Sequence, residues 1–201
     1  MKYLLSTTLL LISFISSNIF SQEMGTLTDE RDGQTYKTVK IGDQTWLAEN
    51  LRFKSDASYS YDKKEENDVK YGRYYSYESA QESCPTGWKL PSQEEYQVLS
   101  DHFGGDYDSG RKLKSTSDWF WTTNGDNSSG FNIIPAGSIY KGTSGSEGEE
   151  AIFWVNGKND NGEGLIRIVT ARDGNTDKAY KFRKSVFPID KGSFSVRCLK
   201  E

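Results

Sequence analysis

The sequence predicts an α+β fold with two short helices, small antiparallel sheets and long irregular loops. Aromatic residues make up 13% of the 201 residues and there are 19 glycines, a composition that favours strands and turns over a helix bundle. Helical patterning is confined to the first half of the chain, between segments that are patterned as strands. The composition excludes collagen, coiled coils and polytopic membrane proteins, and the aromatic residues can bury a sizeable core.

The first 21 residues differ from the rest of the chain and have the pattern of a secretory signal peptide. Lys2 precedes an apolar stretch with interspersed Ser and Thr, and no acidic residue occurs before Glu23. We expect cleavage after Ser21, which leaves residues 22–201 as a single domain, secreted or held at the cell surface, with no integral membrane segment. The alternative is an uncleaved anchor helix, although the stretch is short for a span.

Residues 26–51 predict two successive hairpins. The turn dipeptides Asp32–Gly33 and Gly42–Asp43 separate short runs rich in β-branched and aromatic residues. Residues 54–70 that follow are polar and charged, which predicts a surface loop.

Two helices are predicted after this loop. Residues 76–83 form the first, with Ser76 as its N-cap. Ser92 and Glu95 have the spacing of a capping box, so the second helix is expected to begin after Ser92. Apolar residues then recur on one helical face, and Gly104–Gly105 end the helix.

The second half of the chain predicts further strands and two long loops. A turn at Asp173–Gly174, followed by the apolar run 179–182, indicates a hairpin. The loops are rich in Gly, Ser, Asn and Asp and span residues 137–150 and 156–164. The expected strands are 119–122, 130–135, 152–155 and 165–170.

The end of the chain is predicted to be a half-buried strand that carries one of the two cysteines of a disulfide. Phe194, Val196 and Cys198 alternate as strand residues do. Cys84 and Cys198 are the two cysteines, and an even pair in an exported domain is expected to form a bridge. Closing so long a loop is worth roughly 4–5 kcal/mol in the chain-entropy model. The alternative is two buried free thiols.

The charge balance disfavours nucleic acid as a partner. The formal net charge is −4, so the chain lacks the general attraction that drives binding to a phosphate backbone. The local basic run at Lys178, Lys181, Arg183 and Lys184 is typical of a solvated strand or turn.

Several motifs occur in order along the chain: VKIGDQTWLAENL at 39–51, KYGRYY at 70–75, CPTGWKLPS at 84–92, KLKS at 112–115 and FSVRC at 194–198. Together they resemble one bacterial family, the Fibrobacter succinogenes major paralogous (FISUMP) domain, from about Thr26 to Lys200. The resemblance implies an exported bacterial protein with a C-type-lectin-like fold. It also implies a disulfide from the first helix region to the last strand, which fits Cys84 and Cys198. It supplies no activity.

A more distant resemblance is to formylglycine-generating enzymes, which carry a Leu-Pro-Thr-x-x-Glu-Trp-Glu segment. The segment LPSQEEY at 90–96 is similar to it. That chemistry requires a pair of reactive cysteines that hold copper, and the two cysteines of this chain are better used as a structural bridge. We therefore expect no oxidase activity of this kind.

Other catalytic sets are mostly excluded by composition. His102, the single histidine, is expected to be a surface residue in the last turn of its helix, and one histidine cannot build a multi-His metal site. No G-x-S-x-G, P-loop or Rossmann glycine pattern is present. A pair of carboxylates about 5–10 Å apart would suffice for a glycosidase, and 29 acidic residues offer many pairs. We expect no enzyme, with a polysaccharide-active enzyme as the alternative.

Calcium is the cofactor to consider, because many lectins of the implied fold use it. The pattern of calcium ligands in this sequence is incomplete. Asp106 and Asp108 begin a calcium-loop pattern, but Ser117 stands where a bidentate Glu would be needed. Trp154–Asn156 with Asp160 resembles the Trp-Asn-Asp motif of C-type lectins, yet Gly rather than Asp comes next. We expect no cofactor, with calcium as the alternative.

Aromatic side chains offer a calcium-free way to hold a sugar or a peptide. Trp119 and Trp121 would share one face of the predicted strand at 119–122, and Trp154, Asn156 and Asp160 complete the candidate ligand-binding set. The alternative is that these tryptophans are core residues. Six tyrosines between positions 59 and 77 form a second dense group, of which half would face solvent in an extended segment.

These observations predict an exported, non-catalytic binding or surface-structural module. Its partner would be a polysaccharide or a protein at the cell surface or outside the cell. Recognition is expected from the loops 54–70, 137–150 and 156–164, because loops on a rigid scaffold commonly carry function.

Overall fold

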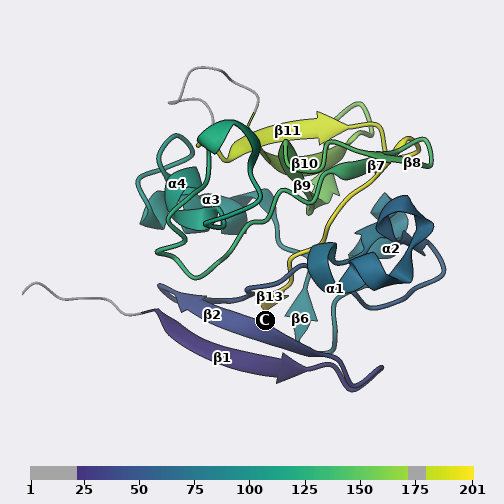
Figure 1. Ribbon diagram of the computed structural model, residues 1–201. Helices are drawn as coiled ribbons and strands as arrows, with labels where there is room; N and C mark the ends of the chain where they lie inside the picture. The colour runs from purple at the N-terminus through teal and green to yellow at the C-terminus, as the bar shows by residue number, and fades with distance from the viewer. Residues whose placement is uncertain (1–21, 172–179) are drawn as a thin grey trace, which may run out of the picture.

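The two ends of the described chain meet in one antiparallel sheet, at the bottom of Figure 1. The computed structural model describes residues 22–171 and 180–201, so the predicted signal peptide and the Asp173–Gly174 turn lie outside it. The strand order of the sheet is β1-β2-β3-β13-β6. The strands are β1 (Glu23–Thr28), β2 (Thr35–Ile41), β3 (Gln44–Leu47), β6 (Trp88–Lys89) and β13 (Leu199–Lys200).

The first three strands confirm both predicted hairpins. β1 pairs with β2 and β2 with β3, each antiparallel. The turns between them contain Gly33 and Gly42, whose φ angles of 74° and 57° are costly for residues with a Cβ. Val39 and Trp46 lie opposite each other across β2 and β3 and are both fully buried, so this face of the sheet covers the core.

Three smaller antiparallel sheets come from the middle of the chain. β9 (Glu150–Lys158) and β10 (Gly164–Thr170) confirm the strands predicted at 152–155 and 165–170. The loop predicted at 137–150 contains the β7–β8 hairpin, and the order of its sheet is β12-β7-β8. The remaining strands are β4 (Ser58–Tyr59), β5 (Tyr74–Tyr75), β7 (Ser138–Tyr140), β8 (Thr143–Gly145), β11 (Arg183–Phe187) and β12 (Gly192–Ser193).

Both predicted helices and both predicted caps are present. α2 (Tyr77–Glu82) starts after Ser76, whose Oγ accepts the backbone N–H of Ser79. α3 (Gln93–His102) starts after Ser92 with a complete capping box, because the Glu95 carboxylate accepts the Ser92 N–H at 2.9 Å in return. The sequence patterns did not predict two one-turn helices, α1 (Asp68–Tyr71) and α4 (Ser109–Leu113), or the 3-10 turns η1 (Tyr61–Lys63), η2 (Glu65–Asn67) and η3 (Phe120–Thr122).

Three strand predictions are wrong. In the segment predicted at 119–122, residues 120–122 form the η3 turn, in which Trp121 has a φ of 54° and cannot continue a strand. Residues 130–135 are irregular apart from one bridge between Ile133 and Lys114. The strand that returns along β10 begins at Arg183, so Tyr180–Phe182 precede it, and the start of the predicted segment lies outside the described residues.

The prediction of a half-buried C-terminal strand is also wrong, because both faces of this segment are buried. Ser195 and Arg197 are each 1% exposed, like the apolar residues that alternate with them. Instead of one strand, the segment 194–198 bonds in turn to several elements. Phe194 exchanges backbone hydrogen bonds with Tyr75, and the Trp154 N–H donates to the Ser195 carbonyl at 3.1 Å.

The C-terminal segment is also joined to the N-terminal sheet. The Leu51 N–H donates to the Val196 carbonyl and the Leu47 N–H to the Cys198 carbonyl. The predicted disulfide between Cys84 and Cys198 is present and closes a separation of 114 residues. This segment therefore connects the terminal sheet, β5, β9 and the end of α2.

Arg197 supplies side-chain contacts at the same place. It is fully buried, and its guanidinium donates to the Asn50 side-chain oxygen at 2.7 Å and to the carbonyls of Leu47, Phe131 and Asn132. Burial lowers the pKa of Arg197 to about 10, so the group is charged at neutral pH. These acceptors replace the water that the charge loses on burial.

The observed fold is mixed α and β, with several small antiparallel sheets and few helices. The main apolar cluster lies between the terminal sheet, α3 and β9, where Trp46 contacts Tyr96 and Phe131 with ring centroids 5.0 and 5.5 Å apart. None of the helices in residues 22–171 and 180–201 has the length and apolar character needed to cross a membrane.

Removal of the bridge by Cys84→Ala with Cys198→Ala is expected to lower the free energy of unfolding by about 4–5 kcal/mol, because the unfolded chain regains the entropy of a 114-residue loop. Urea unfolding of residues 22–201 measures this change. Reduction of the unmutated protein is the matched control and should give a similar loss. A loss below about 1 kcal/mol in both would contradict a stabilising role for the bridge.

The buried tyrosines predict a loss of stability in alkali. Burial raises the pKa of Tyr36 to about 12 and also raises those of Tyr74, Tyr75 and Tyr96. In the unfolded chain these groups ionise near pH 10, so above that pH the unfolded state releases protons that the folded state retains, and the stability falls.

Absorbance at 295 nm, followed during alkaline titration, should show these four tyrosines ionising only when the protein unfolds. A denatured sample, in which all tyrosines ionise together, is the control. Ionisation of every tyrosine near pH 10 in a protein that stays folded would contradict the buried positions.

Candidate functional site

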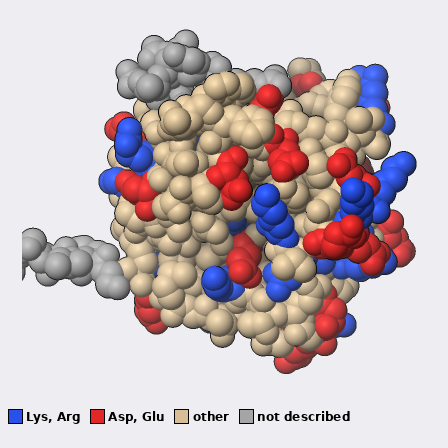
Figure 2. Space-filling view, in the orientation of Figure 1, with Lys and Arg blue, Asp and Glu red and all other residues tan. Residues whose placement is uncertain are grey.

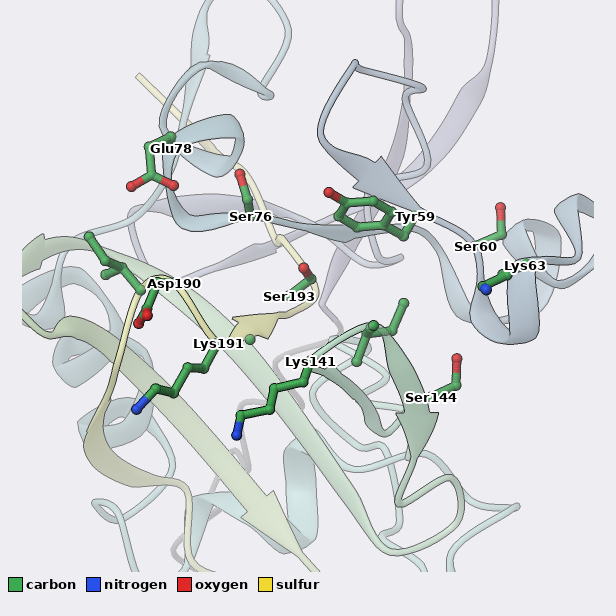
Figure 3. Close-up of a pocket in the computed structure, with 14 residues that line it drawn as sticks. Tyr59, Ser60, Lys63, Ser76, Glu78, Lys141, Ser144, Asp190, Lys191 and Ser193 are labelled. Atoms are coloured by element: carbon green, nitrogen blue, oxygen red, sulfur yellow. The ribbon is translucent and has the colours of Figure 1, made fainter.

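A cavity of about 520 Å³ opens where four segments distant in sequence meet, and we call it the groove (Figure 3). The segments are β4 with the η1 turn, the start of α2, the β7–β8 hairpin and the residues just before β12. Two of the three loops expected to carry recognition, 54–70 and 137–150, line it. The third, 156–164, contains the end of β9, the turn at 159–163 and the first residue of β10, and it contributes no lining residue.

The lining of the groove combines apolar, hydroxyl and charged groups. Ile139 and Ile189 give it an apolar surface, and the ring of Tyr59 is 48% exposed beside them. Serine side chains lie around the cavity, and charged side chains stand at its edges (Figure 3). A flat ring with adjacent hydroxyl and charged groups can hold a polar ligand by stacking and hydrogen bonding.

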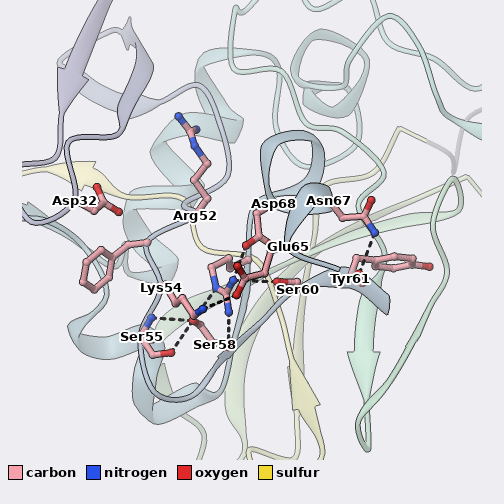
Figure 4. Close-up of polar contacts among 12 residues, drawn as sticks. Asp32, Arg52, Lys54, Ser55, Ser58, Ser60, Tyr61, Glu65, Asn67 and Asp68 are labelled. Carbon is pink, nitrogen blue, oxygen red and sulfur yellow. Dashed lines mark hydrogen bonds and ion pairs between the residues drawn. The ribbon is translucent and has the colours of Figure 1, made fainter. Parts of the chain in front are cut away.

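The loop 54–70 is held in shape by Arg73, a residue of the KYGRYY motif. Its guanidinium is buried and donates to the Oγ atoms of Ser58 and Ser60, both at 2.9 Å, and to the Ser58 carbonyl. It also forms an ion pair with Asp68. Figure 4 shows Ser58, Ser60 and Asp68 close together at this place in the loop. The polar composition of this segment predicted a surface loop, but these contacts give it a fixed conformation.

The same loop is joined to the β7–β8 hairpin across the groove. The Asp62 N–H donates to Ser144 Oγ at 2.8 Å. Behind this contact lies a small apolar cluster in which Tyr61 contacts Tyr71 and Tyr74, with ring centroids 5.3 and 6.0 Å apart. The two walls of the groove are therefore connected directly and share a packed base.

A second, smaller cavity of about 240 Å³ borders that tyrosine cluster at Tyr71, and we call it the acidic cleft. Phe120 and the buried Trp119 contribute aromatic surface, and Asp118 and Glu147 contribute carboxylates. The Tyr71 hydroxyl donates a short hydrogen bond to Glu147. Burial, together with that bond, raises the pKa of Tyr71, so Tyr71 is the proton donor in this pair.

The turn beside the acidic cleft separates the two candidate tryptophans. Trp119 is 4% exposed, and its indole N–H contacts Ser115 Oγ and the Ile133 carbonyl, so it is a core residue. Trp121 is 59% exposed and has a left-handed backbone, a conformation that is rare for a bulky side chain. The expectation that both share one strand face is therefore wrong.

The other predicted ligand-binding residues are not brought together. Trp154 is fully buried, and its indole N–H donates to the Tyr75 carbonyl at 2.8 Å. This position favours the core alternative for Trp154. Asn156 and Asp160 are exposed at the end of β9 and in the turn after it, and neither lines the groove or the acidic cleft.

The calcium candidates also have other contacts. Asp106 forms an ion pair with the buried Arg167 at 2.8 Å, and Asp108 is exposed immediately before α4. Across the described residues, no group of three or more His, Cys, Asp or Glu side chains is placed to hold a metal ion.

The dense tyrosine group is mostly buried. Five of the six tyrosines from 59 to 77 are at most 7% exposed, so the expectation that half of them face solvent is wrong. Tyr59 is the exposed member and the one that lines the groove. His102 is exposed in the last turn of α3, as predicted.

Sequence reasoning missed the contribution of residues 189–193 to the groove. No motif marks them, and they reach the site because β12 pairs with β7. Sequence reasoning also missed the lysines of the groove, because no motif or spacing in the sequence marks them. On the face shown in Figure 2, charged side chains of both signs gather over α1 and α2, whereas much of the remaining surface is uncharged.

Comparison with known proteins identifies the family of the chain. No curated protein matches it, and no solved structure does. The model of the Fibrobacter succinogenes major domain matches residues 39–200, which include every motif listed above for the resemblance and both cysteines. The chain therefore belongs to the Fibrobacter succinogenes major domain family.

Proposed function

We propose that the chain is an exported, non-catalytic module that binds a polysaccharide in the groove. The observation that carries this proposal is the cavity of about 520 Å³ at the junction of the loops 54–70 and 137–150. Its exposed Tyr59 ring suits stacking on a sugar face, and the serine hydroxyls suit hydrogen bonds to sugar hydroxyls. A protein ligand is the second possibility for the same surface.

The disulfide of the protein supports export. A disulfide that closes a long loop indicates an oxidising, extracellular environment. We infer that residues 1–21 are the signal peptide that delivers the chain there.

We also infer that the domain is related to the C-type-lectin-like fold. The bridge from the end of α2 to the last strands and the pairing of N-terminal and C-terminal strands in one sheet support this inference. In that fold, long loops on one side carry the ligand, as we propose for the groove.

An enzyme that cleaves polysaccharide is the second candidate, and the acidic cleft favours it. Asp118 and Glu147 are a pair of carboxylates in an aromatic-lined cavity, to which the exposed Phe120 contributes. Both carboxylates have partners, since Asp118 forms an ion pair with Lys70 at 3.7 Å and Glu147 accepts from Tyr71. These contacts suit a structural role, and for this reason we place catalysis second.

A binding screen of residues 22–201 against cell-wall polysaccharides and glycans tests the proposal. We expect binding that persists in EDTA, and Tyr59→Ala should weaken it about 5- to 30-fold, because loss of a stacked ring costs about 1–2 kcal/mol. Tyr107→Ala is the matched control, since Tyr107 is 66% exposed outside the groove.

Three other results would change the account. Binding that disappears in EDTA would contradict the calcium-free site. Release of reducing sugar that is abolished by Asp118→Asn or Glu147→Gln would support the enzyme instead. Binding that Tyr59→Ala leaves unchanged would show that the groove is not the site.

A further inference from the structure

Three lysines line the groove, and they come from three separate segments. Lys63 lies in η1, Lys141 in the β7–β8 turn and Lys191 just before β12. Within residues 22–171 and 180–201, none of the three forms an ion pair. On a chain with a net charge of −4, the groove is lined by three lysines and two carboxylates, so its lining carries a positive balance.

Two of these lysines are immediate neighbours. The Lys141 N–H donates to the Lys191 carbonyl at 2.8 Å, next to the pair formed by Tyr140 and Gly192 across β7 and β12. Figure 3 shows the two side chains extending in the same direction from the edge of the groove. Like charges at neighbouring positions repel each other. The Lys141 ammonium lies 5.3 Å from the centroid of the Tyr140 ring, a contact that leaves its charge available to an anion.

The backbone at the lysines is unusual for their residue type. Lys63 and Lys141 have φ angles of 59° and 48°, in the left-handed region. Lys141 and Gly142 are the two central residues of the β7–β8 turn, and both have positive φ. Such a turn favours Asn, Asp or Gly at its first central position. The turn geometry therefore does not account for a lysine there, whereas a ligand in the groove would.

The groove also contains two carboxylates, those of Glu78 and Asp190. Figure 3 shows both on one side of the cavity, with Lys191 next to Asp190 and Lys63 on the opposite side. Carboxylates can accept hydrogen bonds from sugar hydroxyls, while the ammonium groups pair with an anionic substituent. Together with the Tyr59 ring, the lining matches a sugar chain that carries negative charge.

We propose that the groove selects an acidic polysaccharide, one whose sugar units carry carboxylate or sulfate groups that bind Lys63, Lys141 and Lys191. This inference rests on the proposed function and adds the chemical class of its ligand. A nucleic acid fits less well, because its binding would need a larger basic surface than a chain of this net charge provides.

The test uses residues 22–201 and an oligogalacturonate, with its fully methyl-esterified form as the neutral control of the same backbone. Isothermal titration calorimetry should give a Kd at least tenfold lower for the acid than for the ester. The difference should shrink at high salt, since screening weakens exposed charge pairs. A sulfated polysaccharide in a third arm shows which anionic group is preferred, and single-stranded DNA in a fourth measures binding by charge alone.

The variant Lys141→Asn with Lys191→Gln removes the paired charges while it places a favoured residue in the turn. It should remain folded, with an unchanged or higher Tm, and bind the acid at least tenfold more weakly. Lys37→Gln, at an exposed position of β2, is the matched control and should bind as the unmutated chain does.

Equal affinity for acid and ester, with both lost in Tyr59→Ala, would overturn the acidic ligand and leave the proposed function standing. Acid binding that the double variant leaves unchanged would overturn the role of the lysines. DNA binding as tight as that of the best acidic polymer would overturn sugar recognition. Failure of every acidic polymer to bind would also overturn this inference, whereas the proposed function fails only if the wider screen finds no ligand.

Discussion

The fold depends on the segment 194–198, which bonds on all sides to elements that are far apart in the sequence. Its backbone pairs with Tyr75, Trp154, Leu51 and Leu47, and its last residue carries the disulfide to Cys84. Each sheet is small, so no single sheet supplies a large ladder of hydrogen bonds. Stability must then come from the connections between sheets, and the buried Arg197 adds several through carbonyls of separate segments.

This scaffold explains how long loops can hold a defined site. The residues just before the segment 194–198 form β12, which pairs with β7 and so fixes the β7–β8 hairpin. Arg73 orders the facing loop, and the contact between Asp62 and Ser144 joins the two walls. The groove is therefore built from loops whose backbone is fixed by buried contacts, an arrangement that reduces the entropy lost when a ligand binds.

Local chemistry made the caps and the hairpins predictable, and the presence of two cysteines made the bridge predictable. The N-caps Ser76 and Ser92 act within three residues of themselves, and the hairpin turns need only adjacent residues. The site depends on contacts across the whole chain, so its lysines and Ile189 carry no local signal. The alternation of residues 119–121 indicated a strand, but the turn rotates Trp121 outwards while Trp119 stays in the core. Pattern reasoning cannot anticipate such a rotation, because the left-handed conformation of Trp121 is intrinsically unfavourable.

The central claim is that ligand binding occurs in the groove, and mapping of the binding surface tests it most directly. Backbone amide NMR spectra of residues 22–201 would be recorded during titration with an oligosaccharide from a polymer that binds. The account predicts shifts concentrated at residues 59–63, 76–78, 139–144 and 189–193. Shifts centred instead on residues 118–122 and 147–148, at the acidic cleft, would contradict it.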